Sequence, residues 1–434
     1  STTVPCAGNH DGFLTKYAPN GDLIWIRTMG GTLGDYAQAM HCDKSNYVYI
    51  SGEMEGYNNL ISFPGSTVTL NCVGDNDLFL AKYDLNGNLI WAKGEGGINS
   101  EKALGITSDM NDNVYICGYY TNTTTINGTA ITGKTGRNIY VAKYDKDGVF
   151  QWFKDAGSDG RDEAKAVKCD AAGNVYICGM FSNNCEFPGN TLTTYNNTNY
   201  WDAFLAKYDP SGNLLWVKTG GGDIDDGAWS LAIDNGGSIY IGGECGAYVS
   251  FSGENPPSVG EADSYVAKYN SGGNLQWIKR VGSDKVDRVR GIGTDGTHIF
   301  ITGQFGGTAY FGGAPAITAG DTSDIYIAAL DSDGSFKWAV AVAGPTDAFE
   351  NLGYESGNGV TGFAAGQDGS VYATGGLLDG GVFGGTTITK AGSRTDAFVT
   401  KVSWDTGMPP LPTAVSALSM DYGIAVYPNP GNGH

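Results

Sequence analysis

The sequence predicts an all-β protein built from a repeated unit of four short antiparallel strands. A phrase recurs six times, for example DLFLAKYDLNGNLIW at 77–91 and DAFLAKYDPSGNLLW at 202–216. The tryptophans that end the copies, at positions 25, 91, 152, 216, 277 and 338, lie 61 to 66 residues apart. Apolar residues alternate or form short blocks, with no sustained period of 3.6 residues. Four strands at this period are typical of a β-propeller blade.

The second copy shows the order of elements within a unit. Residues 79–83 and 89–93 are rich in residues that favour strands, and the link 84–88 carries the Gly and Asn of a tight turn. A third strand is expected over 103–109 and a fourth over 113–118, after a turn at 110–112. A further phrase, at 187–193, 311–318 and 383–389, indicates a Gly-supported turn with a short extended arm.

The blade count follows from how the copies begin and end. The opening acid or amide precedes the Asp that ends strand three by 32 residues in five units and by 44 in the sixth, so we expect an inserted loop around 344–358. A seventh opening, DAFVTKV at 396–402, is incomplete. We favour seven blades, and the alternative is six blades with a spare strand.

The repeated units resemble the repeat of a family of secreted bacterial seven-bladed β-propellers (the SBBP type), over roughly residues 1–402. The resemblance implies that strands three and four form the inner pair of each blade and strands one and two the outer pair. The chain would then open on an outer pair, at 13–27, that has no inner pair of its own.

The C-terminal segment carries a second resemblance. GIAVYPNPGNG at 423–433 is similar to the start of the C-terminal sorting domain of the Bacteroidetes type IX secretion system. We therefore expect a propeller at 1–404, a Pro-containing linker at 405–420 and a truncated start of a sorting domain at 421–434. In the alternative, ALSMDYGIAVY at 417–427 is a hairpin of the closing blade.

Composition fits a protein that is secreted or held at the cell surface. The net charge of −20 disfavours nucleic acid and anionic membranes as partners. No apolar run is long enough for a membrane span, so we expect no membrane insertion. The eight cysteines permit disulfides in an exported protein, but several recur at equivalent positions, which suggests small buried residues.

Most repeated side chains have a structural interpretation. The tryptophans are expected to pack within the blades, and the lysines of the repeated phrase to lie on a solvated outer face. A carboxylate just before strand three is expected to accept hydrogen bonds from the neighbouring turn; these are Asp35, Glu101, Asp162, Asp226 and Asp287.

Two sets of residues outside the repeat are candidate sites. Aromatic residues in the links after strand four suit sugars or protein surfaces; the candidates are Tyr57, Tyr119, Tyr120, Tyr195, Tyr200 and Trp201. Asp223, Asp225 and Asp226 place three carboxylates within four positions, a pattern that could hold calcium, and no other cofactor is expected.

These features favour a non-enzymatic binding or scaffold propeller exported by type IX secretion. Its partners would be the secretion machinery, through the tail, and an unidentified protein or glycan. The alternative is a carbohydrate-active enzyme, a glycoside hydrolase or lyase, because two carboxylates that are distant in sequence can form a catalytic pair. No catalytic residue is assigned, since no nucleophile-elbow, zinc or Walker motif occurs.

Overall fold

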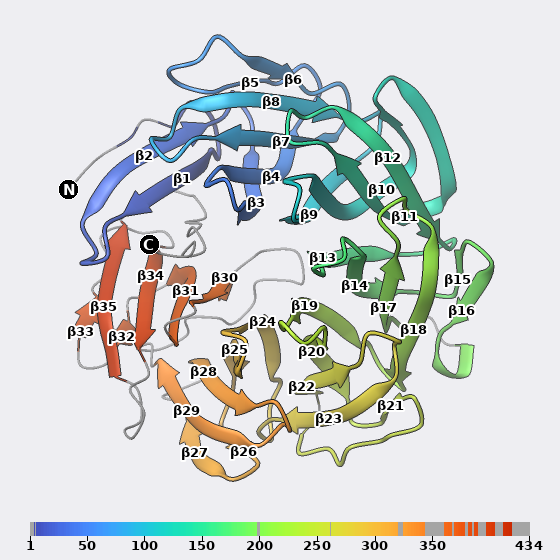
Figure 1. The fold of residues 1–434 in the computed structure, drawn as a ribbon, viewed down its shortest axis with the longest axis vertical. Helices are drawn as coiled ribbons and strands as arrows, with labels where there is room; N and C mark the ends of the chain where they lie inside the picture. Colours follow the sequence, from blue (N-terminus) through green and yellow to red (C-terminus); the bar gives the residue numbers. More distant parts are fainter. Residues whose placement is uncertain are drawn as a thin grey trace. The chain divides into compact units, whose positions relative to one another are not determined.

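The structure is a computed structural model that describes residues 4, 6–197, 200–260, 262–319, 324–342, 360–366, 369–377, 381–383, 386–388, 396–403 and 411–418. It is an all-β propeller, and its described residues form six four-stranded antiparallel blades (Figure 1). The chain divides into two compact units, residues 1–217 and 218–432. The described helical structure is one short 3-10 turn, η1 (Tyr195–Asn197). No helix in these ranges is long and apolar enough to cross a membrane.

The first unit contains the first eighteen strands, of which the last extends past its boundary. They are β1 (Gly12–Tyr17), β2 (Leu23–Met29), β3 (Asp35–Cys42), β4 (Val48–Glu55), β5 (Leu60–Ser62), β6 (Thr69–Asn71), β7 (Asn76–Tyr83), β8 (Leu89–Glu95), β9 (Glu101–Ser108), β10 (Val114–Ile126), β11 (Thr129–Tyr144), β12 (Phe150–Gly157), β13 (Glu163–Cys169), β14 (Val175–Phe181), β15 (Asn184–Phe187), β16 (Asn190–Thr193), β17 (Asp202–Tyr208) and β18 (Leu214–Gly222).

The second unit contains the remaining strands. They are β19 (Gly227–Ile233), β20 (Ile239–Gly246), β21 (Val249–Phe251), β22 (Ala262–Tyr269), β23 (Leu275–Val281), β24 (Arg288–Thr294), β25 (His298–Phe305), β26 (Thr308–Phe311), β27 (Ala314–Thr318), β28 (Asp324–Asp331), β29 (Phe336–Val342), β30 (Val360–Ala365), β31 (Ser370–Leu377), β32 (Gly381–Phe383), β33 (Thr386–Ile388), β34 (Asp396–Ser403) and β35 (Leu411–Leu418).

Each blade combines strands three and four of one repeat with strands one and two of the next. The sheet β3-β4-β7-β8 shows the pattern, and the other blades repeat it. In the first unit β3, β9 and β13 lie beside one another, as β19, β24 and β30 do in the second (Figure 1). Strand three is therefore the inner strand, as the resemblance implies. The arms predicted at 187–193, 311–318 and 383–389 belong to hairpins, β15-β16, β26-β27 and β32-β33, and the strands β5 and β6 form a further hairpin that was not predicted.

Among the residues that the structure describes, the six-blade alternative is the one observed. Strands β1 and β2 form a two-stranded sheet of their own. The sixth blade is completed by β35, which pairs with β34 over residues 411–418, within the segment that the sequence assigned to a linker. The proposed hairpin at 417–427, the tail beyond 418 and the inserted loop at 344–358 lie largely or wholly outside the described residues.

The repeated tryptophan fastens neighbouring blades. In the first unit Trp152 Nε1 donates a hydrogen bond to the backbone carbonyl of Pro210, at 3.2 Å, in the turn of the next blade. Gly212 in that turn has a φ of 82°, and a Cβ there would lie 3.0 Å from Trp152 Cδ2, so glycine serves both the turn and the close approach. Matching bonds join Trp25 to Leu85, Trp91 to Lys146 and Trp277 to Ser332. The packing interpretation of the tryptophans is confirmed.

The repeated lysines correct an expectation. Lys82 is only 5% exposed and Lys207 only 8%, so neither is a solvated surface residue. The Lys82 amine lies 5.0 Å from the centre of the Tyr49 ring and donates to the Lys146 carbonyl that Trp91 also uses. The aliphatic part of a lysine side chain can pack over an aromatic ring while its ammonium group donates to a more distant carbonyl. The alternation of apolar and polar residues along a strand does not predict such an arrangement. We call the shared contact of lysine, tryptophan and turn carbonyl the clasp.

None of the eight cysteines forms a disulfide. Cys72, Cys117, Cys178, Cys185 and Cys245 are buried, which agrees with their interpretation as small core residues. The repeat therefore accounts for most of them through packing.

Candidate functional site

Two acids, 24 residues apart in sequence, meet where one blade adjoins the next. At the junction between the blades of β7 and β9 they are Asp77 and Glu101, which are 2% and 0% exposed. Asp77 accepts a hydrogen bond from the Val73 N–H at 2.9 Å, and Glu101 accepts one from the Gly97 N–H at 3.2 Å. A Cβ on Gly96 would lie 2.6 Å from Asp77 Oδ1 and 2.8 Å from Glu101 Oε2. Both carboxyl groups therefore pack against the backbone of Gly96, where a side chain would not fit. We call such residues junction acids.

Burial makes the junction acids hard to ionise. It raises the pKa of Glu101 to about 8, and the Asp77 carboxyl adds to the rise. It likewise raises the pKa of Asp77 to about 6, although three hydrogen bonds act to lower it. Burial also raises the pKa of other acids at the same repeat positions, to about 6 or 7: Asp35, Asp162, Asp202 and Asp287. The expected hydrogen bonds from the neighbouring turn are present for Asp35, Asp162 and Asp287.

The next junction in the first unit departs from this pattern. Its opening residue is Asn138, whose Oδ1 accepts the Lys134 N–H at 2.8 Å as an acid would. The amide also donates through Nδ2 to the Lys134 carbonyl at 2.9 Å. The hydrogen-bonded geometry of the junction is kept, and one buried acid is removed.

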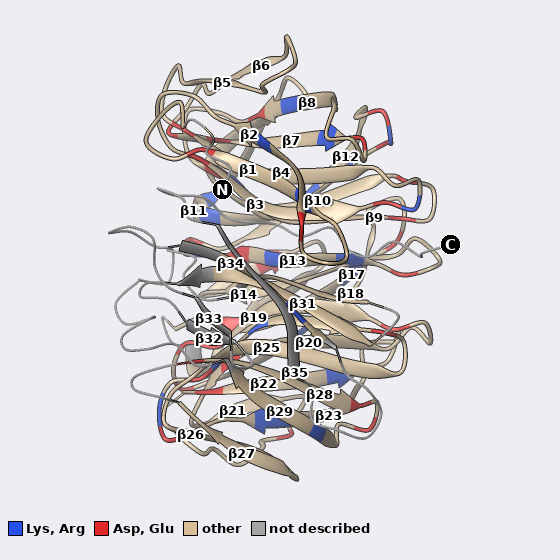
Figure 2. Ribbon diagram, turned by 90° about the vertical axis from the view of Figure 1, so that its left-hand side faces the viewer, with Lys and Arg blue, Asp and Glu red and all other residues tan. Residues whose placement is uncertain are grey.

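Three cations converge on a buried carboxylate at this same junction. Glu163, 1% exposed, accepts hydrogen bonds from Arg137 Nη1, from Arg161 Nε at 2.6 Å and from Lys165 Nζ. Burial alone would raise the pKa of Glu163, but Lys165, Arg161 and Arg137 together lower it to about 2. Basic and acidic residues lie next to one another along β13 (Figure 2). We call these four residues the cation cluster; its formal charge is +2, from three cations and one anion.

Both arginines of the cluster stack on aromatic rings. The guanidinium carbon of Arg137 lies 4.4 Å from the centre of the Tyr119 ring, and that of Arg161 lies 4.5 Å from the Trp201 ring. Stacking holds a planar guanidinium in a fixed orientation, which suits it to recognise a planar anion. The structure thus places two of the predicted aromatic residues, Tyr119 and Trp201, against arginines that were not among the predicted site residues.

The cluster occupies positions at which the other copies carry different side chains. Position 137 corresponds to 10, 76, 201 and 262, where His, Asn, Trp and Ala stand. Position 161 corresponds to Gly, Ser, Asp and Val at 34, 100, 225 and 286. An alignment of the copies shows arginine at positions 137 and 161, where the counterparts in the other copies are different residues. This difference could have identified the site from the sequence.

The other predicted aromatic residues do not gather. Tyr57 is 71% exposed after β4 and Tyr200 is 46% exposed before β17, whereas Tyr195 is partly buried in η1. Tyr119 and Tyr120 are buried, and the Tyr120 hydroxyl donates to Asp155 Oδ2 at 2.6 Å. Burial leaves Tyr120 in a packing position.

The acidic loop binds its own backbone. Asp226 is a junction acid, 1% exposed, whose Oδ1 accepts the Gly246 N–H at 2.8 Å. Asp223 accepts the Tyr248 N–H at 3.4 Å, and Asp225 is partly buried in the short link before β19. Within the described ranges no three His, Cys, Asp or Glu side chains are grouped as metal ligands would be. Calcium at these residues stays a prediction.

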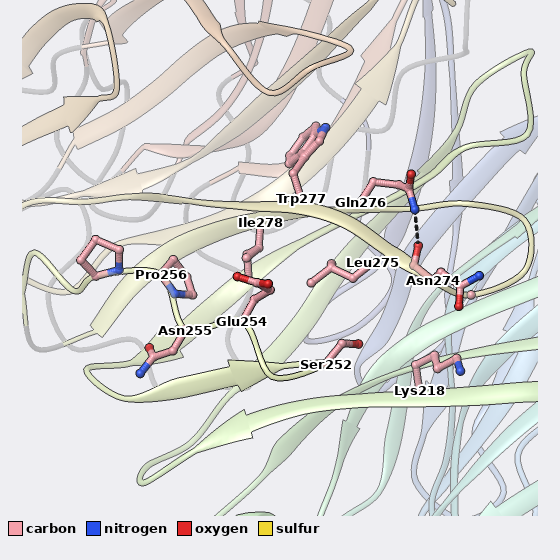
Figure 3. A pocket seen from close by; sticks show the side chains of 12 residues that line it. Lys218, Ser252, Glu254, Asn255, Pro256, Asn274, Leu275, Gln276, Trp277 and Ile278 are labelled. Carbon is pink, nitrogen blue, oxygen red and sulfur yellow. Dashed lines mark hydrogen bonds between the residues drawn. The ribbon is translucent and has the colours of Figure 1, made fainter.

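The second unit contains an open groove of about 740 Å³ between β23 and the turn that follows β21. Lys218, Ser252 and Glu254 form one wall, and the consecutive residues 273–278 form the other (Figure 3). The Trp277 ring points away from Lys218, Ser252 and Glu254. It belongs to the clasp with Ser332, so its backbone and not its ring faces the groove.

Comparison with known proteins gives distant relatives. No family model matches the chain. It is 24% identical over 233 residues to an uncharacterized WD repeat-containing protein of Acanthamoeba polyphaga mimivirus, covering 46% of this chain and 17% of that protein. It is 25% identical over 300 residues to the regulatory protein FlaEY of Caulobacter vibrioides, covering 65% and 30%. The chain therefore spans less than a third of the length of either relative.

Two solved structures are similar at 10% identity. One is a protein of unknown function from Dyadobacter fermentans, with a TM-score of 0.38 and coverage of 94% of this chain and 98% of that one. The other is Sqt1 from Chaetomium thermophilum, with a TM-score of 0.37 and coverage of 96% and 91%. The fold assignment itself depends on the strand pairing described above. A propeller with relatives named as WD repeat and regulatory proteins is consistent with a binding or scaffold module.

Proposed function

We propose that the chain is a secreted or cell-surface, non-enzymatic propeller, and that its cation cluster binds an anionic group of a protein or glycan ligand. The observation that carries the proposal is the convergence of Arg137, Arg161 and Lys165 on one buried carboxylate, at positions where the other copies lack this set. Residues that all copies share build the blades. Residues that one junction alone has acquired are the better candidates for binding.

The charge of the whole chain limits the ligand. A net charge of −20 repels an extended polyanion at long range, whereas the local charge of the cluster attracts a compact anion at short range. A single carboxylate or sulfate on a sugar or peptide fits both conditions. The stacked Trp201 and the exposed Tyr200 beside it offer apolar faces for the rest of such a ligand.

The non-enzymatic part rests on where the unusual acids lie. A general acid needs a raised pKa and must reach the substrate. Among the described carboxyl groups, those with a pKa raised to about 6 or above are junction acids at most 2% exposed, and they accept backbone hydrogen bonds. Their raised pKa is a consequence of blade packing.

The export part rests on the sequence alone. The YPNP motif at 427–430 follows the last repeat, and its residues lie outside the described ranges. We propose that it begins an address read by the type IX secretion machinery of a Bacteroidetes bacterium. Deletion of residues 421–434 from the secreted full-length protein should retain it inside the cell, and continued export would contradict the address.

Calorimetry with a uronic-acid oligosaccharide and its neutral, carboxyl-reduced counterpart tests the binding proposal. The acidic probe should bind, and Arg137→Gln/Arg161→Gln should weaken it by roughly tenfold or more, or about 1.4 kcal/mol. Glu163→Gln should strengthen binding, because it removes the internal anion that competes for the cations. Lys102→Gln is the matched control: Lys102 stands at the Glu163 position of the preceding junction and pairs one-to-one with Glu53 at 2.7 Å.

Equal binding of both probes, or no effect of Glu163→Gln, would contradict the anion site. Cleavage of either probe during the titration would instead favour the alternative, a carbohydrate-active enzyme.

A further inference from the structure

We infer that the groove of the second unit binds an extended polypeptide segment, which adds as a strand to the outer edge of β23. This goes beyond the proposed function, since it concerns a different unit and a different class of ligand. The inference depends on four features of the groove: an open strand edge, a broken arm, backbone strain and separated charges.

The wall formed by β23 is a strand edge and not a strand face. Six consecutive residues, 273–278, line the groove. Side chains alternate between the two faces of a strand, so a run of consecutive residues can line one space only through the backbone edge. Within the described residues β23 ends the sheet β19-β20-β22-β23, with no further strand paired along Leu275–Ile278.

The arm of this blade does not form the hairpin seen elsewhere. In four other arms two strands pair, in β5-β6, β15-β16, β26-β27 and β32-β33. Here β21 pairs with Gly220–Gly222 of β18, and the chain then continues through Asn255, Pro256 and Pro257 with no second arm strand among residues 255–260. Proline lacks an N–H donor and cannot join a ladder, so this stretch lines the groove without filling it.

The turn between β21 and the prolines is strained. Ser252 has a φ of 53°, in the left-handed region that non-glycine residues rarely adopt, and Gly253 follows with a φ of 88°. Hydrogen bonds between the backbones of Phe251 and Glu254 close the turn. Strain of this kind persists where the surroundings fix it, and it is concentrated at binding sites. The turn carries Ser252 and Glu254 on the wall opposite β23.

Two opposite charges lie apart along the groove. In the view of Figure 3, Lys218 lies toward the Asn274 end of the lining segment and Glu254 lies toward the opposite end. A segment added to β23 would place a cationic side chain near Glu254 and an acidic one near Lys218. Backbone hydrogen bonds would supply affinity, and these two charges would fix its direction. A glycan fits less well, because the Trp277 ring points away from Lys218, Ser252 and Glu254.

Two blocked hexapeptides test the inference, Lys-Thr-Val-Thr-Val-Glu and its reversed sequence Glu-Val-Thr-Val-Thr-Lys. Full-length protein should bind one in preference to the other, and hydrogen exchange at the amides of 275–278 should slow when it binds. An analogue N-methylated at alternate residues cannot donate the backbone hydrogen bonds of a ladder. Its affinity should be lower by roughly tenfold or more. A neutral oligosaccharide serves as the competing probe.

Charge exchange gives the decisive comparison. Lys218→Glu/Glu254→Lys should switch the preference to the other hexapeptide, while Lys44→Glu, an exposed lysine of the first unit, should leave it unchanged. The inference is overturned if the N-methylated peptide binds as well as the parent, if exchange at 275–278 is unaffected, or if the oligosaccharide alone binds. Binding of the uronic-acid probe to the cation cluster is measured independently of peptide binding to the groove. One of the two proposals can therefore be contradicted while the other is supported.

Discussion

The junctions at Asp77–Glu101 and at Asn138–Asp162 occupy the same place in the repeat and differ in charge. In each, the opening residue accepts a backbone N–H four positions earlier, at 2.9 Å for Asp77 and 2.8 Å for Asn138. The first junction buries two acids that face one glycine, whereas the second replaces one acid by an amide and gathers three cations on Glu163 nearby. The repeat thus fixes the hydrogen-bond geometry of a junction and leaves its charge free to change.

The largest expected effect concerns what the two junctions share. Trp91→Ala and Trp152→Ala each remove a clasp, and each should lower the free energy of unfolding by about 2–4 kcal/mol, through lost packing and a lost hydrogen bond. Urea denaturation measures both, with Trp→Phe at the same positions as the milder control. A cost at one junction and none at the other would show that the clasp is not common to them.

The second prediction exchanges the residues that distinguish the junctions. Asn138→Asp should create an acid pair beside Asp162 and destabilise the protein at pH 8 by about 1–3 kcal/mol, with little effect near pH 4. Asp77→Asn should do the reverse and stabilise it at pH 8. Unfolding free energies measured at both pH values decide this, and a destabilisation that is equal at both would contradict the electrostatic cause.

The direction follows from the raised pKa values. An acid whose pKa is higher in the folded state keeps its proton there after the unfolded chain has lost it. For Glu101, with a folded pKa of about 8, stability is fully present below its ordinary pKa of 4.5 and declines as pH rises toward 8. Wild-type protein should therefore be more stable at pH 5 than at pH 8, as urea denaturation at the two pH values will measure.

The smallest expected effect concerns the acidic loop of the second unit, which ends at Asp226. If Asp223, Asp225 and Asp226 bind calcium, the ion should raise the melting temperature by the equivalent of about 1 kcal/mol at a few times its dissociation constant. Asp223→Asn/Asp225→Asn/Asp226→Asn should abolish the rise. An unchanged melting temperature in the parent protein would leave Asp226 as a junction acid only.

The sequence was sufficient for what the copies share. Periodicity and turn chemistry predicted the strand order, the arms and the packing role of Trp91 and its counterparts, because each copy repeats the same evidence. It was insufficient for contacts between blades. The burial of Lys82 depends on a carbonyl 64 residues away, which no local pattern contains.

The candidate site was predicted only in part, for a related reason. Tyr119 and Trp201 were selected as unrepeated aromatic residues, but the charges that they hold, Arg137 and Arg161, come from different strands and turns. Residues 137 and 161 are distant in sequence and become neighbours through the pairing of their backbones in the fold. The spacing of residues within a single copy does not show that these two positions are neighbours. Comparison of equivalent positions across the copies does show that both differ from the rest.

The most direct measurement is a paired determination of unfolding free energy and binding of the uronic-acid probe in two variants of the same junction. Arg137→Gln/Arg161→Gln/Glu163→Gln removes cations and buried anion together, and should lose probe affinity by roughly tenfold while unfolding within about 1 kcal/mol of wild type. Trp152→Phe should lose stability and keep the affinity. The opposite pattern is that Trp152→Phe loses affinity and the triple variant loses stability. It would contradict the claim that the shared residues form the scaffold and the divergent residues form the binding site.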